Sequence, residues 1–122
     1  MGYRLNHIAI TTSDVRASRA FWETVFEAMP LERPAQGVSP EGVWYTLGDI
    51  ELHVQYREKP KIRTDQHFSL EVDDADSVAE RCRSMGRLVE EKERLPGYVR
   101  RYLLYDPDDN RVEILQRDQG SQ

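Results

Sequence analysis

The sequence predicts an α+β fold built from two βαβββ modules, whose curved mixed sheets surround a shared cavity. Three observations carry this prediction. The chain of 122 residues is long enough for one core and too short for two independent ones. Each half reads as a strand, a helix and then three strands. A His opens each half and a Glu closes it, since His7 precedes Glu51 by 44 residues and His67 precedes Glu113 by 46.

The first module is expected over about residues 3–58. Its opening run, LNHIAIT, combines β-branched residues with period-two alternation, which is typical of a strand. Helix-capping side chains and an apolar stripe at helical spacing follow this run. Gly48-Asp49 lies between two apolar runs and predicts a tight hairpin. The predicted elements are a strand at 5–11, a helix at 14–27, a short strand in the stretch broken by Pro30 and Pro34, and hairpin strands at 43–47 and 50–56.

The second module is expected over about residues 64–117 and repeats this order. Asp73 and Asp74 can cap a helix, and Gly86 is placed to end it in a left-handed conformation. The turn formers DPDDN join the last two strands. The predicted elements are a strand at 66–72, a helix carrying Ala75, Val78, Cys82 and Met85, a short exposed strand that includes Leu88 and Val89, and hairpin strands at 98–105 and 111–116.

The two modules form a weak internal repeat. Aligning them at the histidines gives an offset of 60 residues, and aligning the closing strands gives 62, which matches Glu51 with Glu113. Residue identity is thin, so the repeat rests on the order of the elements and on the ligand types. Such a module cannot bury both faces of its curved sheet alone. We therefore expect one domain over residues 1–122, in which two sheets face each other.

Four side chains in repeat register predict a metal site formed by His7, Glu51, His67 and Glu113. Imidazole and carboxylate ligands that converge from separate elements suit a divalent Zn, Ni, Co, Fe or Mn ion. Strand alternation places them on the more polar face of each strand, which would line the cavity. His53 shares the face of Glu51 and could replace it as a ligand. Because only Glu51 matches Glu113, we expect His53 to lie beside the metal and contact the substrate.

Composition excludes several classes of function. The net charge of −5 argues against broad binding to nucleic acid or to anionic membranes, which needs a surplus of Lys and Arg on one face. No apolar run approaches the ~20 residues needed to span a bilayer, so we expect a cytoplasmic protein. The single Cys82 rules out an intrachain disulfide.

Four segments of the chain resemble the vicinal oxygen chelate superfamily, which includes glyoxalase I, fosfomycin-resistance proteins, bleomycin-binding proteins and extradiol dioxygenases. These segments span nearly the whole chain and read LNHIAITTSDVRASRAFW, GDIELHV, HFSLEVDDADSVAERCRSMG and DPDDNRVEIL. The resemblance implies a glyoxalase-like fold of paired βαβββ modules, a bound divalent metal ion and a homodimer.

Within this resemblance, the ligand set of glyoxalase I falls on His7, Glu51, His67 and Glu113. It implies a lyase or isomerase that acts on a small oxygenated substrate, such as a thiol adduct, through a metal-bound enediolate. Glu113 or Glu51 would be the catalytic base that moves a proton between adjacent carbons. Arg101, on the last hairpin, would recognise an anionic group of the substrate.

Other functions stay open on the same scaffold. The fosfomycin enzymes resemble this chain at His7, His67 and Glu113, but they carry Thr at the position of Ala9 and a long basic carboxy-terminal tail. Bleomycin-type binding proteins lack the metal ligands, so the presence of all four favours an enzyme over a binding or antibiotic-resistance protein. A dioxygenase-type member would use two His and one Glu and would need a further acid–base residue.

Overall fold

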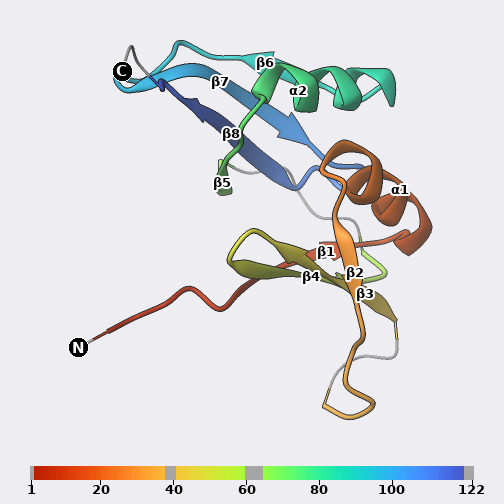
Figure 1. Cartoon of the computed structure of the whole chain (residues 1–122). Helices are drawn as coiled ribbons and strands as arrows, with labels where there is room; N and C mark the ends of the chain where they lie inside the picture. Colours follow the sequence, from red (N-terminus) through yellow and green to blue (C-terminus); the bar gives the residue numbers. More distant parts are fainter. Residues whose placement is uncertain (1, 38–40, 60–64, 120–122) are drawn as a thin grey trace. The chain divides into compact units, whose positions relative to one another are not determined.

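The chain forms two compact units, Met1–Lys61 and Ile62–Gln122, in a computed structural model (Figure 1). The structure describes residues 2–37, 41–59 and 65–119. Each unit runs through strand, helix and three strands, which confirms the α+β class and the two βαβββ modules. Residue 64, the expected start of the second repeat, and the outermost residues of the chain lie outside the described residues. The single domain and the shared cavity stay predictions.

The first unit is a four-stranded mixed sheet with one helix. Strand β1 (His7–Thr12) pairs in parallel with β4 (Ile50–Tyr56), and the antiparallel strands β3 (Gly42–Leu47) and β2 (Met29–Leu31) follow. Helix α1 (Val15–Val25) begins after Asp14, whose carboxylate accepts a hydrogen bond from the amide of Ala17. The helix packs against β3 and β4.

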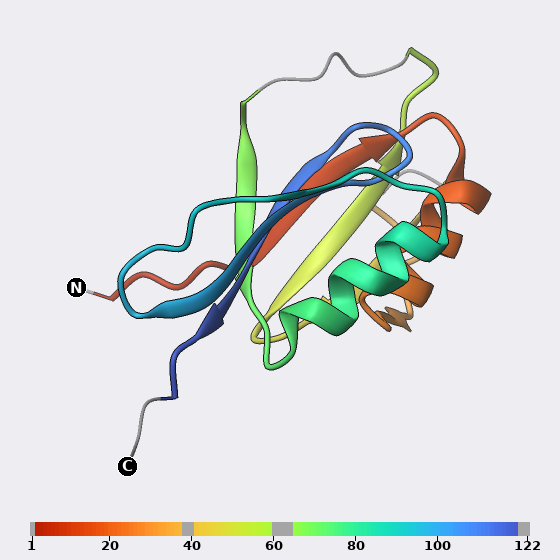
Figure 2. The same cartoon turned by 90° about the horizontal axis from the view of Figure 1, so that it is seen from above.

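The second unit repeats this plan. Strand β5 (His67–Glu71) pairs in parallel with β8 (Arg111–Arg117), and the antiparallel strands β7 (Tyr98–Tyr105) and β6 (Val89–Glu91) follow. Helix α2 (Ala75–Ser84) contacts β6, β7 and β8. Figure 2 shows each helix as a coil that follows the first strand of its own unit.

Helix α2 begins and ends where the sequence predicts. The carboxylate of Asp74 accepts hydrogen bonds from the amide and the hydroxyl of Ser77, so it caps α2. Gly86 adopts a φ of 73° and donates its amide hydrogen to the carbonyl of Arg83, which confirms the predicted stop. Among the described residues, no helix is long and apolar enough to cross a membrane.

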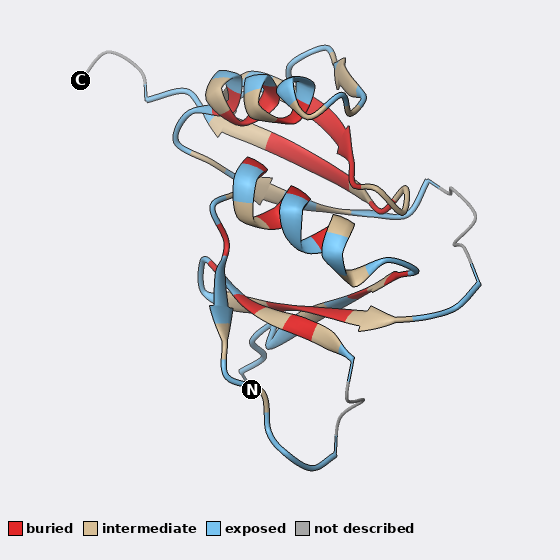
Figure 3. Cartoon of the chain, turned by 90° about the vertical axis from the view of Figure 1, so that its right-hand side faces the viewer, coloured by how far each residue is buried: buried red, intermediate tan, exposed pale blue. Residues whose placement is uncertain are grey.

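Apolar residues that share one face of β4 and of β8 are buried, and so are His53 and Glu113 on the other face. Leu52 and Val54 of β4 are buried, as are Val112 and Ile114 of β8. Figure 3 shows the buried residues of each helix on one side of the coil, with exposed residues on the other. Each helix therefore covers the apolar face of its own sheet, and the candidate site residues lie on the opposite face.

The two parallel ladders share one register. The first ladder pairs Ala9 with His53, and the second pairs Ser69 with Glu113. An offset of 60 residues relates both pairs, so His53 is the structural counterpart of Glu113. The offset of 62, which matched Glu51 with Glu113, is wrong for the strand pairing, so the repeat gives no reason to prefer Glu51 over His53 as a ligand. Likeness between the short runs IELHVQ and VEILQ does not determine which residues of the first strand they face.

Candidate metal centre and catalytic site

His7 is the first residue of β1, and one of its ring nitrogens forms a hydrogen bond within the protein. Its Nδ1 lies 2.8 Å from Oδ1 of Asn6, and the backbone carbonyl of Asn6 accepts the amide hydrogen of Glu51 at 3.2 Å. Because an amide oxygen only accepts hydrogen bonds, Nδ1 is the donor in this contact, and Nε2 is the ring nitrogen left for a metal ion. The imidazole is exposed, so Nε2 is available as a metal ligand.

His53 lies at the centre of the polar face of the first sheet. Its ring stacks on Trp44 with centroids 3.7 Å apart and on His7 with centroids 4.1 Å apart. Its Nε2 lies 2.9 Å from Oε1 of Glu51. The side chain of His53 is 8% exposed and that of Glu51 is 44% exposed. The imidazole is thus enclosed, while the carboxylate it contacts reaches solvent.

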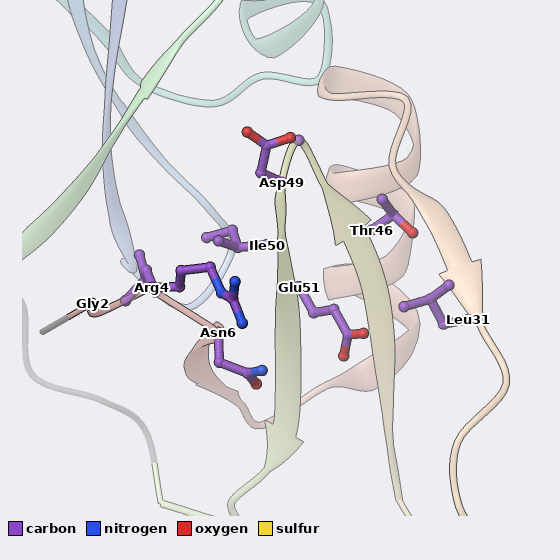
Figure 4. Close-up of a pocket in the computed structure, with 10 residues that line it drawn as sticks. Gly2, Arg4, Asn6, Leu31, Thr46, Asp49, Ile50 and Glu51 are labelled. Carbon is purple, nitrogen blue, oxygen red and sulfur yellow. The ribbon is translucent and has the colours of Figure 1, made fainter.

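A pocket of about 680 Å³ lies beside Glu51 in the first unit (Figure 4). Arg4 and Asn6, from the segment that precedes β1, line it together with Thr46 of β3 and Leu31 of β2. The pocket therefore places a cation, an amide and a carboxylate around one hollow. Such a mixture suits a small polar molecule.

His67 is the first residue of β5, and its ring makes the same kind of contact as the ring of its counterpart, His7. Its Nδ1 lies 2.9 Å from the backbone carbonyl oxygen of Asp65. A carbonyl oxygen only accepts, so Nδ1 is the donor in this contact, and Nε2 of the exposed ring is the nitrogen left for a metal ion. Metal-binding histidines commonly use their second ring nitrogen in this way, because the hydrogen bond orients the ring.

Glu113 is the most enclosed of the four predicted ligands, with a side chain only 9% exposed. Burial alone would raise its pKa, but hydrogen bonds from Arg101 and Ser69 and the nearby charges of Arg101 and His67 lower the pKa below its ordinary value. The carboxylate is consequently held in its charged form. A charged, oriented carboxylate is the form that binds a divalent cation.

Arg101 reaches Glu113 from the neighbouring strand β7. Its Nε donates a hydrogen bond to Oε2 of Glu113 at 2.7 Å, and its Nη1 donates to the carbonyl oxygen of Glu93 at 3.3 Å. The guanidinium therefore has two partners within the protein. Its expected contact with a substrate anion stays a prediction.

The structure gathers the predicted site residues in two groups, one in each unit. His7 and Glu51 both contact His53, and Arg101 contacts Glu113, whose pKa is also lowered by His67. Among residues 2–37, 41–59 and 65–119, no group of three or more His, Cys, Asp or Glu side chains is placed to hold a metal ion. The donor types nevertheless fit a divalent ion, since imidazole nitrogens and carboxylate oxygens are ligands that such ions accept.

Sequence reasoning missed the residues that orient the predicted ligands. Asn6 and Asp65 fix the tautomers of the two histidines, Ser69 bonds to Glu113, and Trp44 covers His53. A signal existed for Ser69, because strand alternation places it on the face of the His two residues before it. No comparable signal in the sequence marks the backbone carbonyl of Asp65.

Comparison with known proteins supports one family. A sequence profile of the glyoxalase/bleomycin resistance protein/dioxygenase superfamily matches residues 4–114. A comparison with curated proteins finds no match.

Several solved structures share the fold. A protein assigned to the glyoxalase family, from Bacillus anthracis, is 20% identical, with a TM-score of 0.83 over 97% of this chain and 98% of that one. A mutant of the fosfomycin resistance protein FosX from Listeria monocytogenes, complexed with Mn(II) and 1S,2S-dihydroxypropylphosphonic acid, is 20% identical, with a TM-score of 0.82 over 98% and 95%. FosX from Mesorhizobium loti is 24% identical, with a TM-score of 0.74 over 98% and 96%.

The profile match covers most of the chain, and it includes all four predicted ligands, from His7 to Glu113. The paired βαβββ units agree with the fold of the similar structures. This chain belongs to the glyoxalase/bleomycin resistance protein/dioxygenase superfamily.

Proposed function

We propose that this protein is a divalent-metal-dependent enzyme of the glyoxalase type, a lyase or isomerase that acts on a small oxygenated substrate. The proposed ligands are His7 and Glu51 of the first unit and His67 and Glu113 of the second. The observation that carries the proposal is the hydrogen bond that orients each of the two histidine rings. Each engages Nδ1 with an oxygen acceptor and leaves Nε2 available to a metal ion.

The proposed ion is Zn, Ni, Co, Fe or Mn, because all of these accept mixed imidazole and carboxylate ligands. When bound, it would polarise a carbonyl oxygen of the substrate as a Lewis acid. The structure of FosX with Mn(II) supports a metal in this family, although that ion belongs to FosX.

The two carboxylates take different roles in this proposal. Arg101 and Ser69 stabilise the charge of Glu113, which makes it a good ligand and a weak base. Oε1 of Glu51 lies 2.9 Å from Nε2 of His53, and the side chain lines a pocket in the first unit. We therefore assign the proton transfer to Glu51: its carboxylate takes a proton from the carbon next to the substrate carbonyl and returns it to the adjacent carbon.

A substrate screen tests this assignment. Metal-loaded protein is mixed with methylglyoxal and a series of thiols, and formation of the thioester is followed by absorbance. Glu51→Gln should lower kcat about 10²–10⁴-fold, the usual contribution of a positioned base. Glu80→Gln, an equal change of charge on the exposed face of α2, serves as the control. Equal activity in Glu51→Gln and the control would overturn the role of Glu51.

The homodimer belongs to the same proposal, because small members of this superfamily are commonly dimeric. Sedimentation equilibrium of the wild-type protein measures its mass directly. A particle of twice the 14.3 kDa chain mass is expected, and a 14.3 kDa particle at all concentrations would contradict it.

A fosfomycin-type activity is the second candidate, because FosX structures from two organisms share the fold over nearly the whole chain. It is tested by incubating the metal-loaded protein with fosfomycin, with and without a thiol, and following the phosphonate by ³¹P NMR. Conversion of fosfomycin without conversion of any methylglyoxal adduct would favour this candidate over the first.

A further inference from the structure

We propose that His53 is a positioning residue that holds two of the proposed ligands at once: the ring of His7 by stacking and the carboxylate of Glu51 by a hydrogen bond. This inference rests on the proposed function, because it assigns a role to a residue beside the proposed metal. It also answers whether His53 or Glu51 acts as the ligand of the first unit.

Three aromatic rings form a continuous stack across three adjacent strands. Trp44 on β3 and His53 on β4 are cross-strand partners, and their rings are nearly parallel, with an interplanar angle of 2° and centroids 3.7 Å apart. His7 on β1 covers the other face of His53 at 4.1 Å, with an angle of 15°. The imidazole of His53 is thus fixed on both faces, and it fixes the plane of the His7 ring in turn.

The edge of the same ring engages Glu51. Nε2 of His53 lies 2.9 Å from Oε1 of Glu51. A carboxylate oxygen accepts, so Nε2 donates and carries a hydrogen. That nitrogen therefore has no lone pair to offer a metal ion. The hydrogen bond restrains the carboxylate of Glu51, whose side chain is 44% exposed.

The stacking geometry also separates the roles of the two imidazoles. A metal ligand directs its nitrogen lone pair in the plane of the ring toward the ion. The rings of His7 and His53 lie face to face within 15° of parallel and 4.1 Å apart, so one ion cannot lie in the planes of both rings at bonding distance. With His7 as ligand, His53 is the support of the ligand and not a second ligand.

Two conservative substitutions separate the two contacts. His53→Phe keeps an aromatic ring between Trp44 and His7 but cannot bond to Glu51. His53→Gln keeps a donor for Glu51 but removes the ring. His53→Ala removes both, and it should weaken metal binding about 10–100-fold, the usual loss when a partner that orients ligands is removed. Each conservative variant should lose less affinity than His53→Ala.

Zn²⁺ binding to the apoprotein tests the inference without any substrate. The dissociation constant is measured by competition with a chromogenic chelator, and tryptophan emission is recorded in the same titration. Emission of the wild type should change on Zn²⁺ binding, because Trp44 stacks on the ring that supports His7. Trp44→Phe, which keeps Trp22 as the remaining tryptophan, should lose this change while it still binds Zn²⁺.

A double-variant comparison isolates the hydrogen bond. His53→Phe should weaken Zn²⁺ binding in the wild-type background and have no further effect in a Glu51→Ala background, since its only lost partner is gone. If His53 were itself the ligand, His53→Phe would weaken binding equally in both backgrounds, and this result would overturn the inference. Far-ultraviolet circular dichroism of each variant shows that the sheet is retained.

The outcomes distinguish this inference from the proposed function. Wild-type protein that binds no Zn²⁺ would overturn the proposed metal centre and the inference together. Wild-type protein that binds Zn²⁺, with His53→Ala binding within about threefold of it, would overturn the positioning role alone, because that loss is below the range seen for such partners.

Discussion

Arg101 on β7 donates a hydrogen bond to Glu113 on β8 at 2.7 Å, and the pair has little contact with solvent. The side chains are 28% and 9% exposed, respectively. A charged hydrogen bond in such an enclosed place is stronger than one at an open surface. In the second unit Arg101 thus supports a proposed ligand from the neighbouring strand, and in the first unit His53 supports Glu51 from the same strand.

Replacing Arg101 should therefore weaken both the fold and the metal site. Arg101→Met leaves the carboxylate of Glu113 without its strongest donor, which should cost about 1–3 kcal/mol of unfolding free energy. The pKa of Glu113 should rise, and Zn²⁺ affinity should fall at acid pH, where protons compete with the ion for this carboxylate. Urea unfolding and a Zn²⁺ titration measure the two effects. Unchanged stability and affinity in Arg101→Met would show that the pair has no such role.

The carboxylate of Glu23 predicts how the free energy of unfolding depends on pH. Glu23 of α1 accepts hydrogen bonds from Arg19 at 2.7 Å and from Tyr45 at 2.8 Å. The bond from Arg19 lowers the pKa of Glu23, burial opposes this, and the bond from Tyr45 lowers it further. A carboxyl group whose pKa is lower in the folded state stabilises the fold above its unfolded pKa, and this stabilisation is lost as the pH falls through the folded pKa.

Glu23→Gln should consequently cost about 1 kcal/mol at neutral pH. The difference from wild type should shrink below about pH 4, where the carboxyl group of the unfolded chain becomes protonated. Denaturant unfolding at a series of pH values measures this difference, with Glu32→Gln at an exposed position as the control. A difference that stays constant from pH 7 to the acid limit would contradict the linkage.

Gly42 provides a test of the close contact between β3 and β4. It has a φ of 131°, and a Cβ atom there would overlap the carbonyl oxygen of Val54. Gly42→Ala should cost at least about 1–3 kcal/mol and disturb the strand that carries Trp44. Gly48 is the matched control, because its φ of 60° is also positive but a Cβ atom would meet nothing within 4 Å. Equal losses of stability in the two variants would contradict the steric argument.

The elements of both units could be predicted because local chemistry marks their ends. Asp14 and Asp74 cap the two helices as expected, and Gly86 ends the second. The predicted strand bounds agree with the observed ones to within about two residues, as is usual where strand ends are set by pairing partners. The two-residue turn at Gly48-Asp49 places Leu47 opposite Ile50.

The contacts of the site were harder to predict because they depend on register between distant strands. The pairing of Trp44 with His53 could be predicted from the turn at Gly48-Asp49, because a two-residue turn determines which residues of its two strands face each other. The position of Glu113 opposite Ser69 needed the parallel pairing of β5 with β8, which no turn determines. For this reason the repeat alignment was displaced by two residues at the closing strands.

Metal content tests the central claim most directly. The protein is purified without chelator, and Zn, Ni, Co, Fe and Mn are measured by elemental analysis before and after reconstitution. About one ion per chain is expected for a mononuclear site of this kind. The double variant His7→Ala, Glu113→Ala should hold none, and the double variant Glu32→Ala, Glu80→Ala should hold as much as wild type. No metal in the wild-type protein after reconstitution, or equal metal in the His7→Ala, Glu113→Ala variant, would contradict the proposed metal centre.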